Sequence, residues 1–225
     1  MTKAHPIMFT AEMVRAILYG RKTQTRRVIS PQPIIPPDFA PPYISDGCLS
    51  CIKRSPEFQG WFWVGDQQGK KIRCPYAVGD LLWVRETWRP CRDEELWDVV
   101  RYAADMAVKK PIITDENAGM KFSEDCDRSS LRCRWRPSIF MPRWASRITL
   151  EVTGVRVQRV QEISEKDAEA EGVIGIDLVL GIVGVVIPYR AAFRAIWERI
   201  NGTRGFGWSV NPYVWVIEFE VVNAR

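Results

Sequence analysis

Histidine is almost absent from this chain, which limits the chemistry that an active centre can use. His5 is the only histidine among the 225 residues. Metal sites built from imidazoles and Ser-His-Asp catalytic sites both need histidine at their centre. The composition therefore counts against both kinds of site, and we expect no metal and no cofactor.

Long apolar runs are absent as well. The longest is Leu178–Ile187, and Gly181 and Gly184 interrupt it. A helix needs about 20 apolar residues to cross a bilayer, so this run is too short. Residues 1–10 also lack the apolar segment of a secretory signal. We therefore expect a soluble, cytoplasmic protein that does not bind membranes.

Cysteine is scarce and scattered. Without a secretory signal, the six cysteines are expected to be reduced thiols. Cys48 and Cys51 have the spacing of one half of a zinc ribbon, but the chain has no second pair of this kind. One interpretation is a zinc site built from Cys48, Cys51, Cys74 and one further cysteine. The other is a set of free structural thiols, which the lone half-site favours.

Strong charge of either sign is also lacking. The formal net charge of +5 is only mildly basic. Such an excess of cations agrees with an anionic partner such as nucleic acid. It agrees equally with a soluble protein that has a slightly basic surface, and charge alone favours this second interpretation.

The N-terminal part predicts a strand, a helix and a second strand. Ile7–Phe9 is a short apolar run. Thr10 is a suitable N-cap for a helix over about Ala11–Tyr19, which carries an apolar stripe and ends at Gly20. A strand over Lys22–Ile29 follows.

Two irregular regions interrupt the pattern, at about residues 30–76 and 89–136. The first opens with six prolines and contains part of a predicted hairpin at Trp61–Val64. The second contains one predicted strand, Val99–Ala103, and a polar segment over Thr114–Arg134. We interpret both regions as insertions in a single domain that spans residues 1–225.

The remaining residues predict further strands and two helices. Leu81–Trp88 is expected to be a buried strand. Alternating apolar residues over Ser146–Ile163 predict one long strand, or two strands joined near Gly154. Ser164 begins a capping-box-like sequence for a short helix that ends at Gly172. An amphipathic helix at Tyr189–Ile200 and a final strand at Tyr213–Val222 complete the chain.

These elements predict the fold class α+β. The strands do not alternate one for one with helices, which argues against a doubly wound parallel sheet. A small mixed or antiparallel β-barrel with helices outside it fits this order better.

The most informative segment is Gly20–Arg27, which holds four cations and two threonines within eight residues. In an extended chain Arg21, Thr23, Thr25 and Arg27 share one face, and Lys22, Gln24 and Arg26 share the other. A local twist or bulge would bring Lys22 and Thr25 together at the strand entrance. We interpret this strand as one that carries polar chemistry.

These residues and two later segments resemble the ASCH domain, a relative of the PUA RNA-binding domain, in a long form often seen in phages and prophages. The resemblance implies a PUA-like barrel with flanking helices and a cleft for a nucleotide or an RNA strand. It covers about half of the chain, and the two insertions lie outside it. Three segments carry it: Gly20–Arg26, Val78–Glu86 and Ile163–Gly172, the last followed by the closing strand Trp215–Phe219.

The resemblance also implies a function. Some small ASCH proteins are amidohydrolases that remove the acetyl group from N(4)-acetylcytidine, and their catalytic set corresponds here to Lys22, Thr25 and Glu171. Thr25 would be the nucleophile, Lys22 its base and Glu171 the acid/base. Burial and the nearby cations Arg21 and Arg26 would lower the pKa of Lys22 and so help it to act as a base.

Five further residues are candidates for substrate binding, and each has a plainer interpretation. Arg21 and Arg26 belong to a basic strand whose charges could simply be solvated. Glu86 ends an apolar strand and could form a structural ion pair with Arg85 or Arg147. The remaining candidates, Trp144 and Trp208, could form a ligand wall, although most tryptophans belong to cores.

Two other functions stay open. The first is an RNA-binding or RNA-cleaving protein without amidohydrolase activity, whose affinity would fall steeply with salt. Arginines beside tryptophans at residues 135–136 and 143–144 are typical of surfaces that stack bases and hold phosphates. The second is a phage factor that binds a host protein through its insertions, although no segment identifies a partner.

Overall fold

The computed structural model describes most of the chain, and its residues fall into two compact units. One unit contains Met1–Gly20, Asp80–Glu151 and Val221–Arg225, and the other contains Arg21–Gly79 and Val152–Glu220. We call them unit 1 and unit 2. The described residues are 2–35, 41–45, 47–52, 61–63, 65, 70–92, 98–109, 134–173 and 188–224.

Unit 1 begins with the predicted strand and helix. Strand β1 (Ala4–Met8) pairs in parallel with β6 (Leu81–Arg85), which pairs on its other side with the start of β10 (Ile148–Arg159). Helix α1 (Ala11–Leu18) follows Thr10, whose side chain accepts a hydrogen bond from the N–H of Met13 at 3.4 Å. The predicted N-cap is therefore confirmed.

A second sheet in unit 1 lies within the region predicted as the later insertion, except for Trp88, which the sequence assigned to the strand over Leu81–Trp88. Antiparallel strands β7 (Trp88–Arg92), β8 (Asp98–Tyr102) and β9 (Val108–Lys109) form it. The sequence predicts only β8, because Pro90 interrupts the pattern of β7 and β9 is two residues long. Two short 3₁₀ helices follow, Ser138–Phe140 and Arg143–Ala145. A small core joins them to the sheet and contains Trp88, Val100, Tyr102, Met141 and Ala145.

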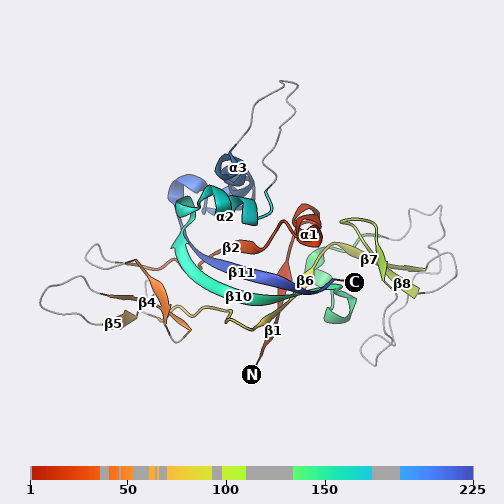
Figure 1. Cartoon of the computed structure of the whole chain (residues 1–225), viewed down its shortest axis with the longest axis horizontal. Helices are drawn as coiled ribbons and strands as arrows, with labels where there is room; N and C mark the ends of the chain where they lie inside the picture. Colours follow the sequence, from red (N-terminus) through yellow and green to blue (C-terminus); the bar gives the residue numbers. More distant parts are fainter. Residues whose placement is uncertain are drawn as a thin grey trace, which may run out of the picture. The chain divides into compact units, whose positions relative to one another are not determined.

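Unit 2 contains the basic strand that the sequence singles out. Strand β2 (Gln24–Val28) pairs antiparallel with β11 (Tyr213–Ala224). Helices α2 (Glu165–Ala170) and α3 (Tyr189–Asn201) lie together beside this pair (Figure 1). Their apolar faces enclose a core that includes Val160, Ile163, Ala168, Phe193, Trp197, Val214 and Val216. This packing fixes α2 against β2.

A third sheet belongs to the first predicted insertion. It contains the antiparallel strands β3 (Tyr43–Ser45), β4 (Cys48–Ile52) and β5 (Trp61–Trp63). β5 corresponds to the predicted hairpin strand. Leu178–Ile187 and almost all of the predicted polar segment Thr114–Arg134 lie outside the described residues. The prediction of a single domain with insertions at about 30–76 and 89–136 stays a prediction.

The main sheet has the strand order β1-β6-β10-β11-β2. The α+β class is confirmed, but the predicted barrel is wrong for the part of the chain that the structure describes. The sheet there is open, with β1 and β2 as its edges. Alternating residues identify strands and their buried faces, whereas closure depends on tilt and register, which the pattern does not contain. Among the described helices, none is long and apolar enough to span a membrane.

Candidate functional site

The basic segment before β2 is attached directly to the C-terminal end of α2. Lys22 forms an isolated bridge with Glu171, and the N–H of Thr23 donates to the carbonyl of Ala170 at 2.9 Å. The carbonyl of Thr23 accepts a hydrogen bond from Phe219 of β11, also at 2.9 Å. Thr23 therefore lies at the junction between the α2 contact and the β2–β11 ladder.

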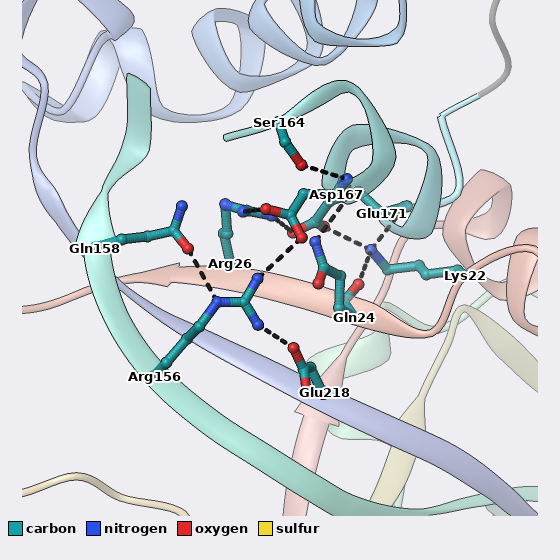
Figure 2. A network of polar contacts seen from close by, with 9 residues as sticks. All are labelled: Lys22, Gln24, Arg26, Arg156, Gln158, Ser164, Asp167, Glu171 and Glu218. Carbon is teal, nitrogen blue, oxygen red and sulfur yellow. Dashed lines mark hydrogen bonds and ion pairs between the residues drawn. The ribbon is translucent and has the colours of Figure 1, made fainter. Parts of the chain in front are cut away.

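The Lys22 ammonium group is buried and fully hydrogen-bonded. Lys22 is 1% exposed. Its Nζ donates to Glu171 Oε2, to the main-chain carbonyl of Glu171 and to that of Gln24, each at 2.8 Å (Figure 2). A lysine ammonium carries three protons, so each proton has one acceptor. This arrangement suits the charged form of Lys22.

Burial lowers the pKa of Lys22 from its ordinary value of 10.5. The Glu171 carboxylate opposes that lowering through its charge and its hydrogen bond, while Arg27 and Arg26 add to it. The ammonium is thus destabilised by its surroundings but fixed in place by its acceptors.

Arg26 shares the Glu171 carboxylate with Lys22. Its Nη1 donates to Glu171 Oε1 at 3.0 Å, and its Nη2 donates to Asp167 Oδ2 at 3.2 Å. Gln24 Nε2 donates to the carbonyl of Asp167 at 2.8 Å. The predicted face of Lys22, Gln24 and Arg26 is therefore the face that meets α2 (Figure 2).

The network continues outward from Asp167. Arg156 Nη2 donates to Asp167 Oδ1 at 2.9 Å, and Arg156 Nη1 contacts Glu218 Oε1. Burial opposes ionisation of Asp167, but Arg26, Arg156 and hydrogen bonds from Ser164 hold its pKa below the usual range. Charges alternate from the buried end to the half-exposed end in the order Lys22, Glu171, Arg26, Asp167, Arg156, Glu218.

Thr25 lies in β2 opposite Ile217 of β11 and is 3% exposed. Its neighbours Gln24 and Arg26 direct their side chains to α2. Side chains alternate along a strand, so the Thr25 side chain points to the opposite face of β2. The structure thus brings Lys22 and Glu171 together and places Thr25 on the other side of the strand.

Two aromatic rings lie near Arg26 in the network. The Arg26 guanidinium stands 5.7 Å from the ring centre of Phe193, and Trp208 meets Phe193 edge to face at 6.4 Å. Trp208 itself is half-buried in an ordered turn. Its main-chain N–H donates to Glu198 Oε2 at 2.7 Å, and its main-chain carbonyl accepts from Gln161 Nε2. Phe193 therefore connects Trp208 to the network.

The remaining candidates for substrate binding are Arg21, Glu86 and Trp144. Arg21 is exposed. Glu86 and Trp144 belong to unit 1, where the Trp144 ring meets Trp88 edge to face at 6.0 Å. Glu86 makes a bidentate ion pair with Arg147, with both N–O distances at 2.9 Å, so of the two alternative partners the structure shows Arg147.

The possible zinc site is only partly described. Cys48 is buried, and it pairs with Arg73 in an isolated bridge next to Cys74. The Cys51 side chain lies outside the described residues. Within those that are described, no group of three or more histidine, cysteine, aspartate or glutamate side chains is arranged to hold a metal ion.

Asp167 belongs to the network, although the sequence did not predict it as a site residue. A usable signal was present, since Asp167 and Glu171 are four residues apart and so lie on one face of α2. Two carboxylates on one helix face beside a strand that carries Lys22 and Arg26 indicate an ion-pair network. Arg156 on the long strand β10 offered no comparable signal.

Comparison with known proteins gives little further information. No protein-family model matches the chain, and no curated protein matches it. Among solved structures, the chain is similar to a crystal structure of a protein from Enterococcus faecalis V583 described with the family DUF984, at 10% identity and a TM-score of 0.38. The similarity covers 100% of this chain and 82% of that protein. It is too low to carry an argument about fold or function.

Proposed function

We propose that this protein is an ASCH-type hydrolase that removes an acyl group from the exocyclic nitrogen of a modified cytidine. One observation supports the proposal most. Lys22 and Glu171, which are 149 positions apart, meet as a buried ion pair with an N–O distance of 2.8 Å. These are two of the three residues that the motif resemblance singles out.

Hydrolysis of an N(4)-acyl group requires a nucleophile and a proton carrier. In the proposed reaction the nucleophile bonds to the acyl carbon, its proton passes to the Lys22–Glu171 pair, and the pair returns a proton to N(4) as the carbon–nitrogen bond breaks. With water as nucleophile, the carboxylic acid and the amine form directly. With Thr25 as nucleophile, an ester forms, and water then hydrolyses it to release the carboxylic acid and restore the hydroxyl; this route needs a proton acceptor on the face of β2 to which Thr25 points. Neither step needs a metal or a histidine.

A substrate panel tests this function. We expect purified protein to hydrolyse N(4)-acetylcytidine, and Lys22→Ala to lose at least about 100-fold in kcat/KM, since general acid–base groups contribute on this scale. The panel should include other N(4)-acyl cytidines and short acetylated RNAs, followed by chromatography of the products. Absence of hydrolysis by wild type, or full activity in Lys22→Ala, would contradict the proposal.

Two variants at one position decide which nucleophile is used. Thr25→Ser keeps a hydroxyl and Thr25→Val keeps the shape without it. If Thr25 attacks the acyl carbon, Thr25→Val loses activity at least about 100-fold while Thr25→Ser retains a substantial part of it. If both variants are equally active, water bound at the Lys22–Glu171 pair is the nucleophile. The rate of each variant with N(4)-acetylcytidine is the measurement.

Nucleic-acid binding is a second candidate, which a feature of unit 1 favours. Arginine guanidinium groups lie over half-buried tryptophan rings at Arg85–Trp83 and Arg89–Trp135, both at 4.6 Å, and exposed Arg136 lies over the buried ring of Trp88 at 5.2 Å. Exposed Phe140 and Arg143 lie nearby in the sequence. Such a surface should bind short RNA with an affinity that falls steeply as salt rises. A fluorescence titration at two salt concentrations, on wild type and Arg136→Ala, separates this function from hydrolysis of a neutral nucleoside.

A further inference from the structure

Contacts on several sides enclose the guanidinium of Arg26. The side chain is fully buried, with Glu171 at Nη1, Asp167 at Nη2 and the Phe193 ring nearby (Figure 2). A side chain held in this way is poorly placed to contact a substrate. It is well placed to fix the carboxylate that it touches.

The contact with Arg26 determines how the Glu171 carboxylate is aimed. Arg26 holds Oε1, so rotation about the last side-chain bond is blocked and Oε2 is directed at Lys22 Nζ. The main-chain carbonyl of Glu171 binds the same Nζ at 2.8 Å, which fixes Lys22 as well. Proton transfer between Nζ and Oε2 then needs no reorientation of either group.

Asp167 fixes Arg26 in turn. It lies one turn before Glu171 on the same face of α2, and its N–H donates to Ser164 Oγ at 3.0 Å. Its carboxylate is held between Arg156 and Arg26. Since arginine stays charged in proteins, the Asp167 carboxylate also balances the charge that Arg26 brings into a buried site.

We propose that Asp167 and Arg26 form a positioning pair, in which Asp167 orients Arg26 and Arg26 aims Glu171 Oε2 at the ammonium of Lys22. Neither residue touches the substrate. The kinetic consequence rests on the proposed hydrolase function, whereas the geometric consequence at Lys22 can be tested without any substrate. Arg26, expected from the sequence to bind substrate, acts through Glu171 instead.

Kinetics of Asp167→Asn provide the first test. This change keeps the side-chain shape and removes the charge, and we expect kcat for N(4)-acetylcytidine to fall about tenfold with KM within about twofold. Asp167→Glu restores the charge and is expected to recover most of the lost kcat. Glu169→Gln is the matched control, because Glu169 is exposed on the same helix, and its kcat should equal that of wild type.

A spectroscopic signature provides the second test. In protein labelled with ¹⁵N-lysine, the Lys22 ammonium should give a slowly exchanging signal near neutral pH that disappears in Lys22→Arg. We expect that signal to shift or broaden in Asp167→Asn and to stay unchanged in Glu169→Gln. Arg26→Lys keeps the charge but loses the forked pair of donors, so it should perturb the Lys22 signal as Asp167→Asn does. Arg26→Lys replaces Asp167→Asn in this test if Asp167→Asn does not fold.

The outcomes separate the two proposals. If wild type does not hydrolyse acylcytidines but the Lys22 signal responds to Asp167→Asn, the positioning pair stands and the hydrolase function fails. If hydrolysis occurs but Asp167→Asn raises KM at constant kcat, the pair contacts substrate and the positioning role is overturned. An unchanged Lys22 signal in both Asp167→Asn and Arg26→Lys overturns it as well.

Discussion

Replacing Glu171 with glutamine is expected to lower the free energy of unfolding by about 3–5 kcal/mol, since breaking a buried ion pair leaves charge uncompensated. The effect should lie at the upper end for this network, because two buried cations, Lys22 and Arg26, share the one carboxylate. Urea denaturation of wild type and Glu171→Gln measures the difference. Glu169→Gln makes the same chemical change on the exposed face of α2 and should differ from wild type by less than about 0.5 kcal/mol.

The loss of stability in Glu171→Gln should also depend on pH. Burial lowers the pKa of Lys22, and Glu171 is the main influence that raises it, so Glu171→Gln should lower it further. A lysine whose folded pKa is below its unfolded pKa costs stability at low pH, and the cost disappears as pH rises towards 10.5. The stability difference between wild type and Glu171→Gln should therefore be smaller at pH 9.5 than at pH 7. An equal or larger stability difference at pH 9.5 would contradict the statement that Glu171 raises the pKa of buried Lys22.

The second large effect is expected in unit 1 at Arg147. Its side chain is 4% exposed, and it donates two hydrogen bonds to Glu86 and two to Asp105, all at 2.9 Å. Arg147→Met leaves the Glu86 carboxylate buried without its cation, and we expect a loss of about 3–5 kcal/mol. Thermal or urea denaturation measures it.

A double variant and a pH series test the reason for that loss. Burial raises the pKa of Glu86 and Arg147 opposes the rise, so the pKa of Glu86 should be higher still in Arg147→Met. An acid whose folded pKa is raised costs stability at high pH, and the cost shrinks as pH falls through that pKa. Arg147→Met should therefore lose less stability at pH 5 than at pH 7. The double variant Glu86→Leu/Arg147→Met should recover much of the stability that Arg147→Met loses. If the loss in the double variant instead equals the sum of the two single losses, the ion pair does not explain those losses.

The local elements were the most predictable part of this fold. The Thr10 N-cap, the Ser164 start of α2 and the alternation along β2 all depend on neighbours in the sequence, and the structure has them at the predicted places. The alternation also predicted that Lys22, Gln24 and Arg26 share a face. Local rules of this kind do not determine which strands form the edges of the sheet, and the barrel prediction was wrong for that reason.

The site was predictable only in part. Motif resemblance indicated Lys22 and Glu171, and no local pattern joins two residues so far apart in the chain. Glu86 was ambiguous from sequence because Arg85 is its neighbour, whereas strand geometry directs adjacent side chains to opposite faces and leaves Arg147 as the partner. Glu86 directly follows β6 and Arg147 directly precedes β10. These two strands form a ladder that pairs Thr149 with Trp83, and its register is a property of the folded sheet.

The most direct test of the Lys22–Glu171 pair as the catalytic centre is a double-mutant cycle in kcat/KM for N(4)-acetylcytidine, with Lys22→Met, Glu171→Gln and the double variant. If the amine and the carboxylate transfer protons as one unit, each single variant should lose nearly all of the activity, and the double variant should be no worse than either. Losses that multiply in the double variant, or a wild-type protein without hydrolysis, would contradict it.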